Sequence, residues 1–120
     1  MAVNDLLDRL VAIRDGLRAE VAADVAVLSR DVEDKGEDIT PSQHPADVAS
    51  DLYAREELVA DERRLEGRLA DVERAIARVE AGTYGRCVDC GETIAPERLL
   101  AVPYAARCID CQRIWDWRTR

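Results

Sequence analysis

The chain has 120 residues, of which 35% are charged and only 4% aromatic, and its formal net charge is −8. A chain of this length forms one domain, or one small domain with an extension. The composition is unsuited to a broad globular core and is typical of long helices with a narrow apolar seam.

The acidic charge is distributed unevenly along the chain. Residues 1–44 carry five bases against ten acids, residues 45–82 six against ten, and residues 83–120 six against five. No stretch forms the basic surface that phosphate contacts require, so direct nucleic-acid binding is not expected.

The start of the chain, MAVNDLLDRL, has acids where a secretory signal has positive charge. No run approaches the roughly 18 apolar residues of a membrane span. We therefore expect a cytoplasmic protein with no membrane segment. In a reducing compartment, paired cysteines are more often metal ligands or redox groups than disulfides.

From Val3 to Val32 the apolar residues recur at steps of three or four, which predicts a helix of about eight turns. The stripe consists of Val3, Leu6, Leu10, Ile13, Leu17, Val21, Val25, Leu28 and Val32. The sequence EDKGEDITPSQHP follows. Its charge, glycine and prolines predict a loop over about residues 33–46.

A second helix is predicted from Pro45, which suits a first helical position, to Gly82, which suits a helix end. Its stripe consists of Val48, Leu52, Leu58, Leu65, Leu69, Val72, Ile76 and Val79. From Leu65 onward the spacing is a regular heptad. Arg55 and Glu62 occupy positions where seam residues are expected, so packing should be weaker in the half nearer the loop.

Two stripes joined by a loop of about a dozen residues predict an antiparallel coiled-coil hairpin over residues 1–82. Helices of about thirty residues are roughly 45 Å long, and two of them cannot enclose a core. We therefore expect a projecting arm with a narrow seam. The alternative is that the arm dimerises or completes a bundle in a homo-oligomer.

All four cysteines lie in two Cys-x-x-Cys pairs, Cys87 with Cys90 and Cys108 with Cys111. This spacing is typical of structural zinc sites with four thiolates, which close a tetrahedron and leave no position for water. We predict one structural Zn²⁺ in a finger formed by residues 83–120. Gly91, directly after the first pair, allows the backbone to curl around the metal with positive φ.

The finger has few apolar residues of its own, so metal binding should supply much of its folding energy. These residues are Ile94, Leu99, Leu100 and Pro103. A redox pair would need one Cys-x-x-Cys at a helix start in a βαβ context, which is absent. A four-thiolate iron site uses similar ligands and stays open as an alternative.

The stretch GTYGRCVDCGETIAPERLLAVPYAARCIDCQ, residues 82–112, resembles the zinc-finger signature of the DksA/TraR family. The resemblance is carried by the Gly-x-Tyr-Gly lead, both cysteine pairs, Gly91, Ile94, Arg98, Leu99, Ala101, Pro103 and Ala105. The preceding hairpin fits that family's architecture. The expected fold is therefore dominated by α-helix: a long antiparallel hairpin, a small four-cysteine zinc finger and a short C-terminal helix.

The resemblance implies binding to RNA polymerase through its secondary channel, with the hairpin tip modulating initiation. The family's tip motif, Asp-x-x-Asp-x-Ala, corresponds here to His44, Asp47 and Ala49. His44 departs from the first Asp of the motif, so we expect a different effect on polymerase. Judged by residue type alone, His44 caps a helix and Asp47 complements its dipole.

The resemblance also bears on the alarmone ppGpp. In responsive family members, three basic residues contribute to its binding site, and the matching residues here are Asp71, Val102 and Gln112. None of the three is basic, and an acid at position 71 would repel a polyphosphate. We therefore predict that this protein does not act in synergy with ppGpp.

The last segment, QRIWDWRTR, predicts a short helix that packs one tryptophan, or an aromatic and arginine contact with a partner. An enzyme is not expected, because the chain has one His and no open metal position, phosphate loop or nucleophile–base pair. The expected protein is a monomer or weak dimer that binds RNA polymerase. The alternative is a zinc-stabilised coiled-coil adaptor or self-associating structural protein.

Overall fold

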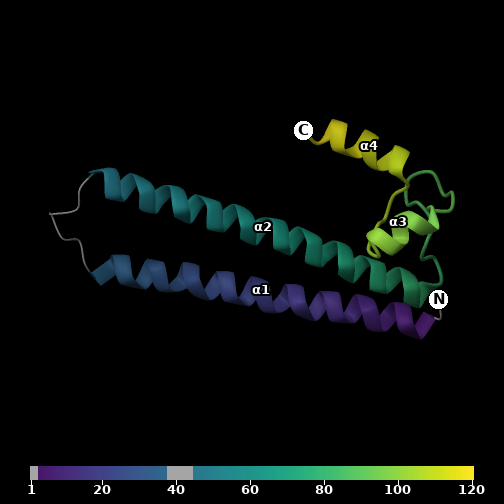
Figure 1. Ribbon diagram of the computed structural model, residues 1–120, viewed down its shortest axis with the longest axis horizontal. Coiled ribbons are helices and arrows are strands. Elements are labelled where there is room, and N and C mark those ends of the chain that lie inside the picture. Colours follow the sequence, from purple (N-terminus) through teal and green to yellow (C-terminus); the bar gives the residue numbers. More distant parts are fainter. Residues whose placement is uncertain (1–2, 38–44) are drawn as a thin grey trace. The chain divides into compact units, whose positions relative to one another are not determined.

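A computed structural model describes the backbone of residues 3–37 and 45–120 and the side chains of residues 3–30 and 48–120. The helices in these ranges are α1 (Val3–Glu37), α2 (Pro45–Ala81), α3 (Pro96–Ala101) and α4 (Ile109–Arg118) (Figure 1). The same ranges contain no strand, although an isolated antiparallel bridge joins Arg86 to Thr93. The predicted helix-dominated fold is confirmed.

Contacts divide the chain into two compact units, each of which contains part of both long helices. Unit 1 comprises the residues up to Asp15 together with Leu69–Arg120, and unit 2 comprises Gly16–Arg68. Within each unit, a segment of α1 runs antiparallel to a segment of α2. By contacts, the base of the hairpin therefore groups with the finger. The division into two domains at residue 82 stays a prediction.

The helical core of unit 1 lies where the predicted stripes meet. Leu10, Val72 and Ala75 are all completely buried. Leu10 and Val72 belong to the two stripes, and Ala75 lies three residues after Val72 on the same side of α2. This part of the hairpin therefore packs as its apolar periodicity predicts.

The seam of unit 2 is more polar than that of unit 1. Leu17 is the only buried side chain that the structure describes in this unit, and Val25 is 44% exposed. Arg55 and Glu62 are half-buried, as expected of charged residues at seam positions, and Asp24 is half-buried as well. Packing is therefore weaker in this half of the hairpin.

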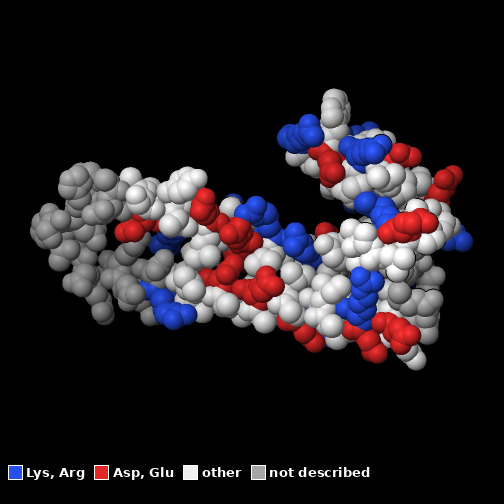
Figure 2. Space-filling view, viewed as in Figure 1, with Lys and Arg blue, Asp and Glu red and all other residues white. Residues whose placement is uncertain are grey.

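Carboxylates crowd one another in this seam. A hydrogen bond with Glu66 raises the pKa of Glu62, and repulsion from Asp24 acts in the same direction. On the face drawn in Figure 2, acidic and basic side chains cover much of the described surface of the long helices. The helices of unit 2 therefore expose a charged surface and retain charge in the seam between them.

α1 extends to Glu37, five residues beyond the end of its apolar stripe at Val32. The sequence of this extension, EDKGE, contains no apolar residue, so it carries no amphipathic signal. Glu and Lys are nonetheless good helix formers. A helix can therefore extend beyond its apolar stripe. The apolar pattern alone predicted a loop from about residue 33, whereas the helix continues to Glu37.

α2 begins at Pro45 and ends at Ala81, as its start and stop signals predict. Gly82 follows with a φ of 76°. The N–H of Gly82 donates to the carbonyl of Val79, and the N–H of Thr83 donates to that of Arg78. This pair of bonds is a Schellman motif, which needs the left-handed conformation that glycine adopts without strain.

None of the helices in the described ranges has the length and apolar character needed to cross a membrane.

Candidate metal centre

The four cysteine sulfurs gather at one point in the finger. The Sγ atoms of Cys87, Cys90, Cys108 and Cys111 all lie within 4.8 Å of one another. Around a tetrahedral zinc ion with Zn–S bonds of about 2.3 Å, the sulfurs are about 3.8 Å apart. The Sγ atoms of Cys90 and Cys108 are 3.9 Å apart. The donor set therefore fits a closed four-thiolate zinc site.

The first pair lies on a tight turn closed by backbone hydrogen bonds. The N–H of Gly91 donates to the carbonyl of Cys87 at 3.0 Å, and the N–H of Cys87 donates to the carbonyl of Glu92 at 2.8 Å. Gly91 has a φ of 77°, the positive value that the sequence predicts. This turn directs both thiols of the pair toward the second pair.

The second pair lies at the start of α4. Cys108 is the N-cap, and its Sγ accepts a hydrogen bond from the backbone N–H of Cys111 at 3.5 Å. The N-terminal end of a helix is the positive end of its dipole and lowers the cost of a thiolate. The same sulfur therefore serves both the helix and the metal centre.

The protonation of the cluster fits a site built for a cation. Burial raises the pKa of Cys87, but hydrogen bonds from the backbone at Cys90, Cys108 and Asp89 outweigh it and lower the pKa to about 6. Hydrogen bonding with the thiols of Cys108 and Cys87 raises the pKa of Cys111. One thiolate forms readily, whereas further ones are opposed unless a cation compensates their charge.

The apolar filling of the finger is smaller than the sequence suggests. Ile94 is 1% exposed, Pro103 is buried and Leu99 is half-buried. Leu100, which we expected inside the finger, is 57% exposed. Leu99 and Leu100 are neighbours on α3 and point about 100° apart, which fits the half-burial of the first and the exposure of the second. Tyr84 adds a polar contact by donating its hydroxyl to the Pro103 carbonyl at 2.7 Å.

The predicted tip residues lie at the edge of the described chain. His44 and the side chain of Asp47 fall outside the described residues. The backbone of Asp47 lies in the first turn of α2, and Ala49 follows in the same helix with an exposed side chain. A role for these residues in binding a partner stays a prediction.

The three positions compared with ppGpp-binding residues come together in the fold. Asp71, Val102 and Gln112 line one cleft of unit 1, which has a volume of about 590 Å³. Four arginines also line this cleft, and the sequence analysis did not name them as part of a site. They are Arg74, Arg78, Arg98 and Arg107. The spacing of Asp71, Arg74 and Arg78 on one face of α2 was the signal that could have indicated part of this cluster.

Two of these arginines are paired with carboxylates. Arg74 lies 3.2 Å from the carboxylate of Asp71. Arg107 lies 2.7 Å from that of Asp89, and its guanidinium is 4.0 Å from the centre of the Trp115 ring. Part of the positive charge of the cleft is therefore already compensated within the protein.

The other two arginines donate to backbone carbonyls. Arg98 Nε donates to the carbonyl of Arg107 at 2.9 Å, and Arg78 reaches that of Ala105 at 3.5 Å. Burial lowers the pKa of Arg78, although this group stays protonated at any physiological pH. These contacts join the loop before Cys108 to α2 through Arg78 and to α3 through Arg98.

α4 leaves its tryptophans largely in solvent. None of its residues is buried. Trp115 is 46% exposed and packs on Arg107, whereas Trp117 is 75% exposed. Trp115 is thus the tryptophan that packs, and it packs against Arg107 of the finger.

Comparison with known proteins identifies the family to which this arrangement of thiols and helices belongs. Residues 82–114 match the family model for the prokaryotic dksA/traR C4-type zinc finger. The protein YteA of Bacillus subtilis is 42% identical over 62 residues, which cover 52% of this chain and 26% of YteA. The chain therefore spans about a quarter of the length of that relative.

Two further relatives cover nearly the whole chain. The RNA polymerase-binding transcription factor DksA of Caulobacter vibrioides is 28% identical over 112 residues, which cover 93% of this chain and 74% of that protein. The solved structure of transcription factor DksA2 from Pseudomonas aeruginosa superposes with a TM-score of 0.73 at 30% identity. It covers 98% of this chain and 85% of that one. With its four clustered thiols and helical hairpin, the chain belongs to the DksA/TraR family and carries that family's structural zinc finger.

Proposed function

We propose that this protein is a transcription regulator that binds RNA polymerase through the secondary channel and modulates initiation with its hairpin tip. The observation that carries the proposal is the likeness to DksA2, which extends over 98% of the chain and includes both the hairpin and the finger. The name of the Caulobacter relative, a polymerase-binding transcription factor, supports the choice of partner.

The form of unit 2 is compatible with entry into a channel. It consists of segments of two helices, each about 10–12 Å wide with its side chains. Residues 16–68 contain fourteen acidic and seven basic residues, so the unit is strongly negative. A narrow acidic arm can carry a carboxylate toward a catalytic metal ion in a space that a globular domain cannot enter.

The tip gives the first test. Asp47→Asn should leave the affinity for core RNA polymerase within about twofold, because one tip side chain contributes little to a large interface. The effect on initiation should fall about tenfold or more, because the substitution removes the negative charge expected to act near the catalytic centre. Binding is measured by competition with labelled wild-type protein, and initiation by multiple-round transcription with purified polymerase.

The matched control for this test is Asp51→Asn, the same chemical change one turn later on α2 at an exposed residue. It should leave both binding and initiation unchanged. If both variants affect initiation equally, the general charge of the arm is responsible and the role proposed for Asp47 is wrong.

We further propose that ppGpp does not enhance this activity. The support is the cleft that Asp71 shares with the arginines, in which Arg74 is already paired with the Asp71 carboxylate at 3.2 Å. A polyphosphate would have to displace that carboxylate and stay beside it, at a Coulombic cost. Part of the positive charge of the cleft is therefore compensated from within the protein.

Asp71→Asn should make transcription by the complex more sensitive to ppGpp, because it removes a negative charge and frees Arg74. Transcription is measured with purified polymerase over a ppGpp titration, beside Glu80→Gln as a control on the same helix away from the cleft. A strong ppGpp effect in the wild type, unchanged in Asp71→Asn, would refute this part of the proposal.

A second candidate is a zinc-stabilised adaptor that self-associates through its arm. It is favoured by the apolar side chains that unit 2 exposes, among them Val25, Val48, Leu52 and Tyr53. The polymerase competition assay separates the two candidates. Failure to bind polymerase, together with a dimer that forms with rising concentration in sedimentation experiments, would support the adaptor.

A further inference from the structure

The two cysteine pairs lie in two copies of one short sequence. The first copy is RCVDC, residues 86–90, and the second is RCIDC, residues 107–111. Each copy has an arginine directly before its first cysteine and an aspartate directly before its second. Because the copies match, a difference between their two arginines, or between their two aspartates, is due to the tertiary structure and not to the local sequence.

An ion pair joins the two copies. Arg107 of the second copy donates through Nε to the carboxylate of Asp89 in the first copy at 2.7 Å. The residues beside them are joined as well, because the N–H of Val88 donates to the carbonyl of Ala106 at 2.9 Å. Two adjacent bonds therefore connect the turn of the first cysteine pair to the segment that leads into the second pair.

Arg107 is held by protein groups on several sides. Its side chain is only 20% exposed. Its guanidinium lies 4.0 Å from the centre of the Trp115 ring, and its carbonyl accepts a hydrogen bond from Arg98 Nε at 2.9 Å. An ion pair that is partly shielded from water is weakened less by solvent and salt than one on the open surface. Arg86 and Asp110, the reciprocal residues of the two copies, are instead exposed.

The charge of the metal centre also favours a cation at this place. Four thiolates around one Zn²⁺ leave two net negative charges, and Asp89 and Asp110 add a carboxylate to each ligand turn. Like charges at short range oppose one another. Arg107 directly precedes the ligand Cys108 and is paired with Asp89, so it offsets part of this charge. Its loss would leave the two turns less firmly joined and more strongly repelled.

We propose that Arg107 is a positioning residue of the zinc centre, which through its ion pair with Asp89 holds the two cysteine pairs at the spacing that one zinc ion requires. Arg86 has no such role, although it occupies the same place in the first copy. Residues that orient metal ligands from outside the ligand set commonly contribute about 10–100-fold to metal affinity. This role concerns the metal centre alone and is independent of polymerase binding.

The test is the affinity of the full-length protein for Zn²⁺, measured under reducing conditions by competition with a chelator of known affinity. Arg107→Met should lower this affinity about tenfold or more, because it removes the charge and keeps an unbranched side chain. Arg86→Met is the matched control, since it makes the same change at the same place in the first copy. It should stay within about twofold of wild type. Equal losses in the two variants would overturn the inference, because any positive charge beside a ligand turn would then be sufficient.

The carboxylates give a second matched pair of variants. Asp89→Asn should also lower the affinity for Zn²⁺, whereas Asp110→Asn should stay within about twofold of wild type. The double variant with Asp89→Asn and Arg107→Met should bind zinc no more weakly than Arg107→Met, because both changes break the same ion pair. Losses that multiply in the double variant would show that the two residues act separately, and would contradict the proposed role.

A conservative variant distinguishes positioning from a general loss of structure. Arg107→Lys should bind Zn²⁺ within about threefold of wild type, because an ammonium group can still face the Asp89 carboxylate. The visible absorption of Co²⁺ bound in place of zinc should be the same in wild type and Arg107→Met, because the same four thiolates bind the metal in both. An Arg107→Lys variant as weak as Arg107→Met, or an altered Co²⁺ spectrum in Arg107→Met, would refute the assignment.

Discussion

Replacing Cys108 by Ser is expected to cost the protein its zinc ion and to unfold the finger of residues 83–120. Structural zinc contributes about 10–16 kcal/mol of apparent binding free energy in zinc-finger peptides, far more than any single apolar residue contributes. The finger buries few side chains besides Cys87, among them Ile94, Pro103 and Ala105. Such a small core does not fold without its metal.

Serine at this position separates the two roles of Cys108. Its hydroxyl is among the best N-caps, so the start of α4 keeps a side-chain acceptor. It does not supply the thiolate that a four-sulfur zinc site requires. Loss of structure in Cys108→Ser is therefore due to the metal and not to the loss of a helix cap.

Zinc content and limited trypsin digestion measure the effect. Arg86, Arg98 and Arg107 all lie in the finger and provide cleavage sites within it. Cleavage there should be rapid in Cys108→Ser and in wild type treated with a chelator. It should be slow in Val88→Ala, a control at a residue that is 51% exposed between the first two ligands. One zinc per chain and full protection in Cys108→Ser would contradict the proposed site.

The second large effect is expected in the helical core of unit 1. Leu10→Ala should lower the free energy of unfolding by about 2–5 kcal/mol, because it removes a buried side chain and leaves a cavity. Leu10 is completely buried, and few other residues of these helices are. The hairpin therefore has little other buried surface to compensate for the loss.

Leu52→Ala is the matched control for Leu10→Ala. It is the same substitution in a long helix, at a residue that is 55% exposed. Leu and Ala have similar helix propensities, so its effect should stay below about 1 kcal/mol. Urea unfolding followed by circular dichroism measures both variants. Equal destabilisation would show that the burial of Leu10 does not determine the stability of the hairpin.

The metal site and the two ends of α2 could be predicted because each depends on local chemistry. Each Cys-x-x-Cys turn brings two sulfurs together, and a shared zinc ion joins the two pairs. Gly82 ends α2 because the Schellman motif needs a residue at positive φ. Neither prediction required knowledge of which elements pack against each other.

Beyond Leu17, the described seam of α1 departs from the predicted stripe at Val25, whereas Val21 and Leu28 are half-buried as predicted. The apolar stripe continues from Leu17 to Val25, eight residues later. Eight residues turn a helix about 80° past the starting direction, whereas seven residues return it to within about 20°. Asp24, seven residues after Leu17, therefore occupies the seam position, and Val25 is displaced toward solvent. A pattern built from apolar residues alone misses a seam position that is occupied by a charged residue, as Asp24 is here.

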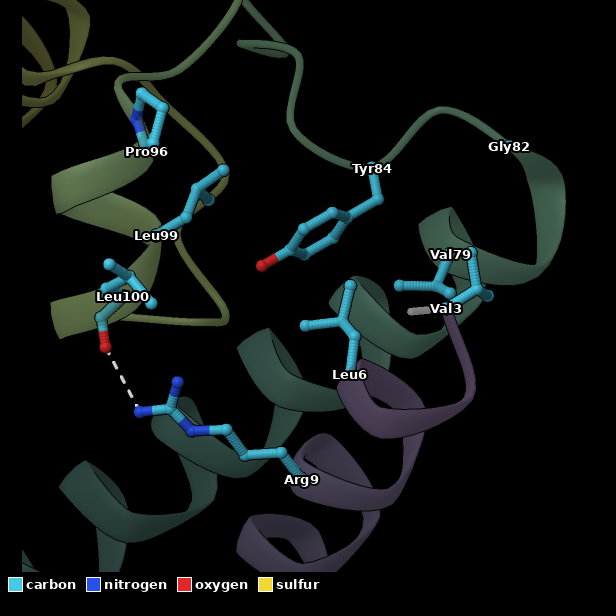
Figure 3. A pocket seen from close by; sticks show the side chains of 9 residues that line it. All are labelled: Val3, Leu6, Arg9, Val79, Gly82, Tyr84, Pro96, Leu99 and Leu100. Atoms are coloured by element: carbon cyan, nitrogen blue, oxygen red, sulfur yellow. Dashed lines mark hydrogen bonds between the residues drawn. The ribbon is translucent and has the colours of Figure 1, made fainter. Parts of the chain in front are cut away.

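Beyond the spacing of Asp71, Arg74 and Arg78 on α2, the arginine-lined cleft and the apolar groove of Figure 3 were not predictable from the sequence. Their residues come from α1, α2, the finger and α4, and only tertiary packing brings them together. Leu100 shows the same limit. Its place in the finger sequence predicted a core residue, but the side chain is 57% exposed and lines the apolar groove of Figure 3.

The charged positions in the seam of unit 2 affect how this chain could assemble. Asp24, Arg55 and Glu62 are half-buried where two helices meet and remain partly hydrated. In a four-helix assembly of two chains, these groups would lie near the central axis, and the loss of their hydration would oppose the gain from covering Val25 and Leu52. Charge at these sites would therefore oppose a four-helix assembly of two chains through unit 2.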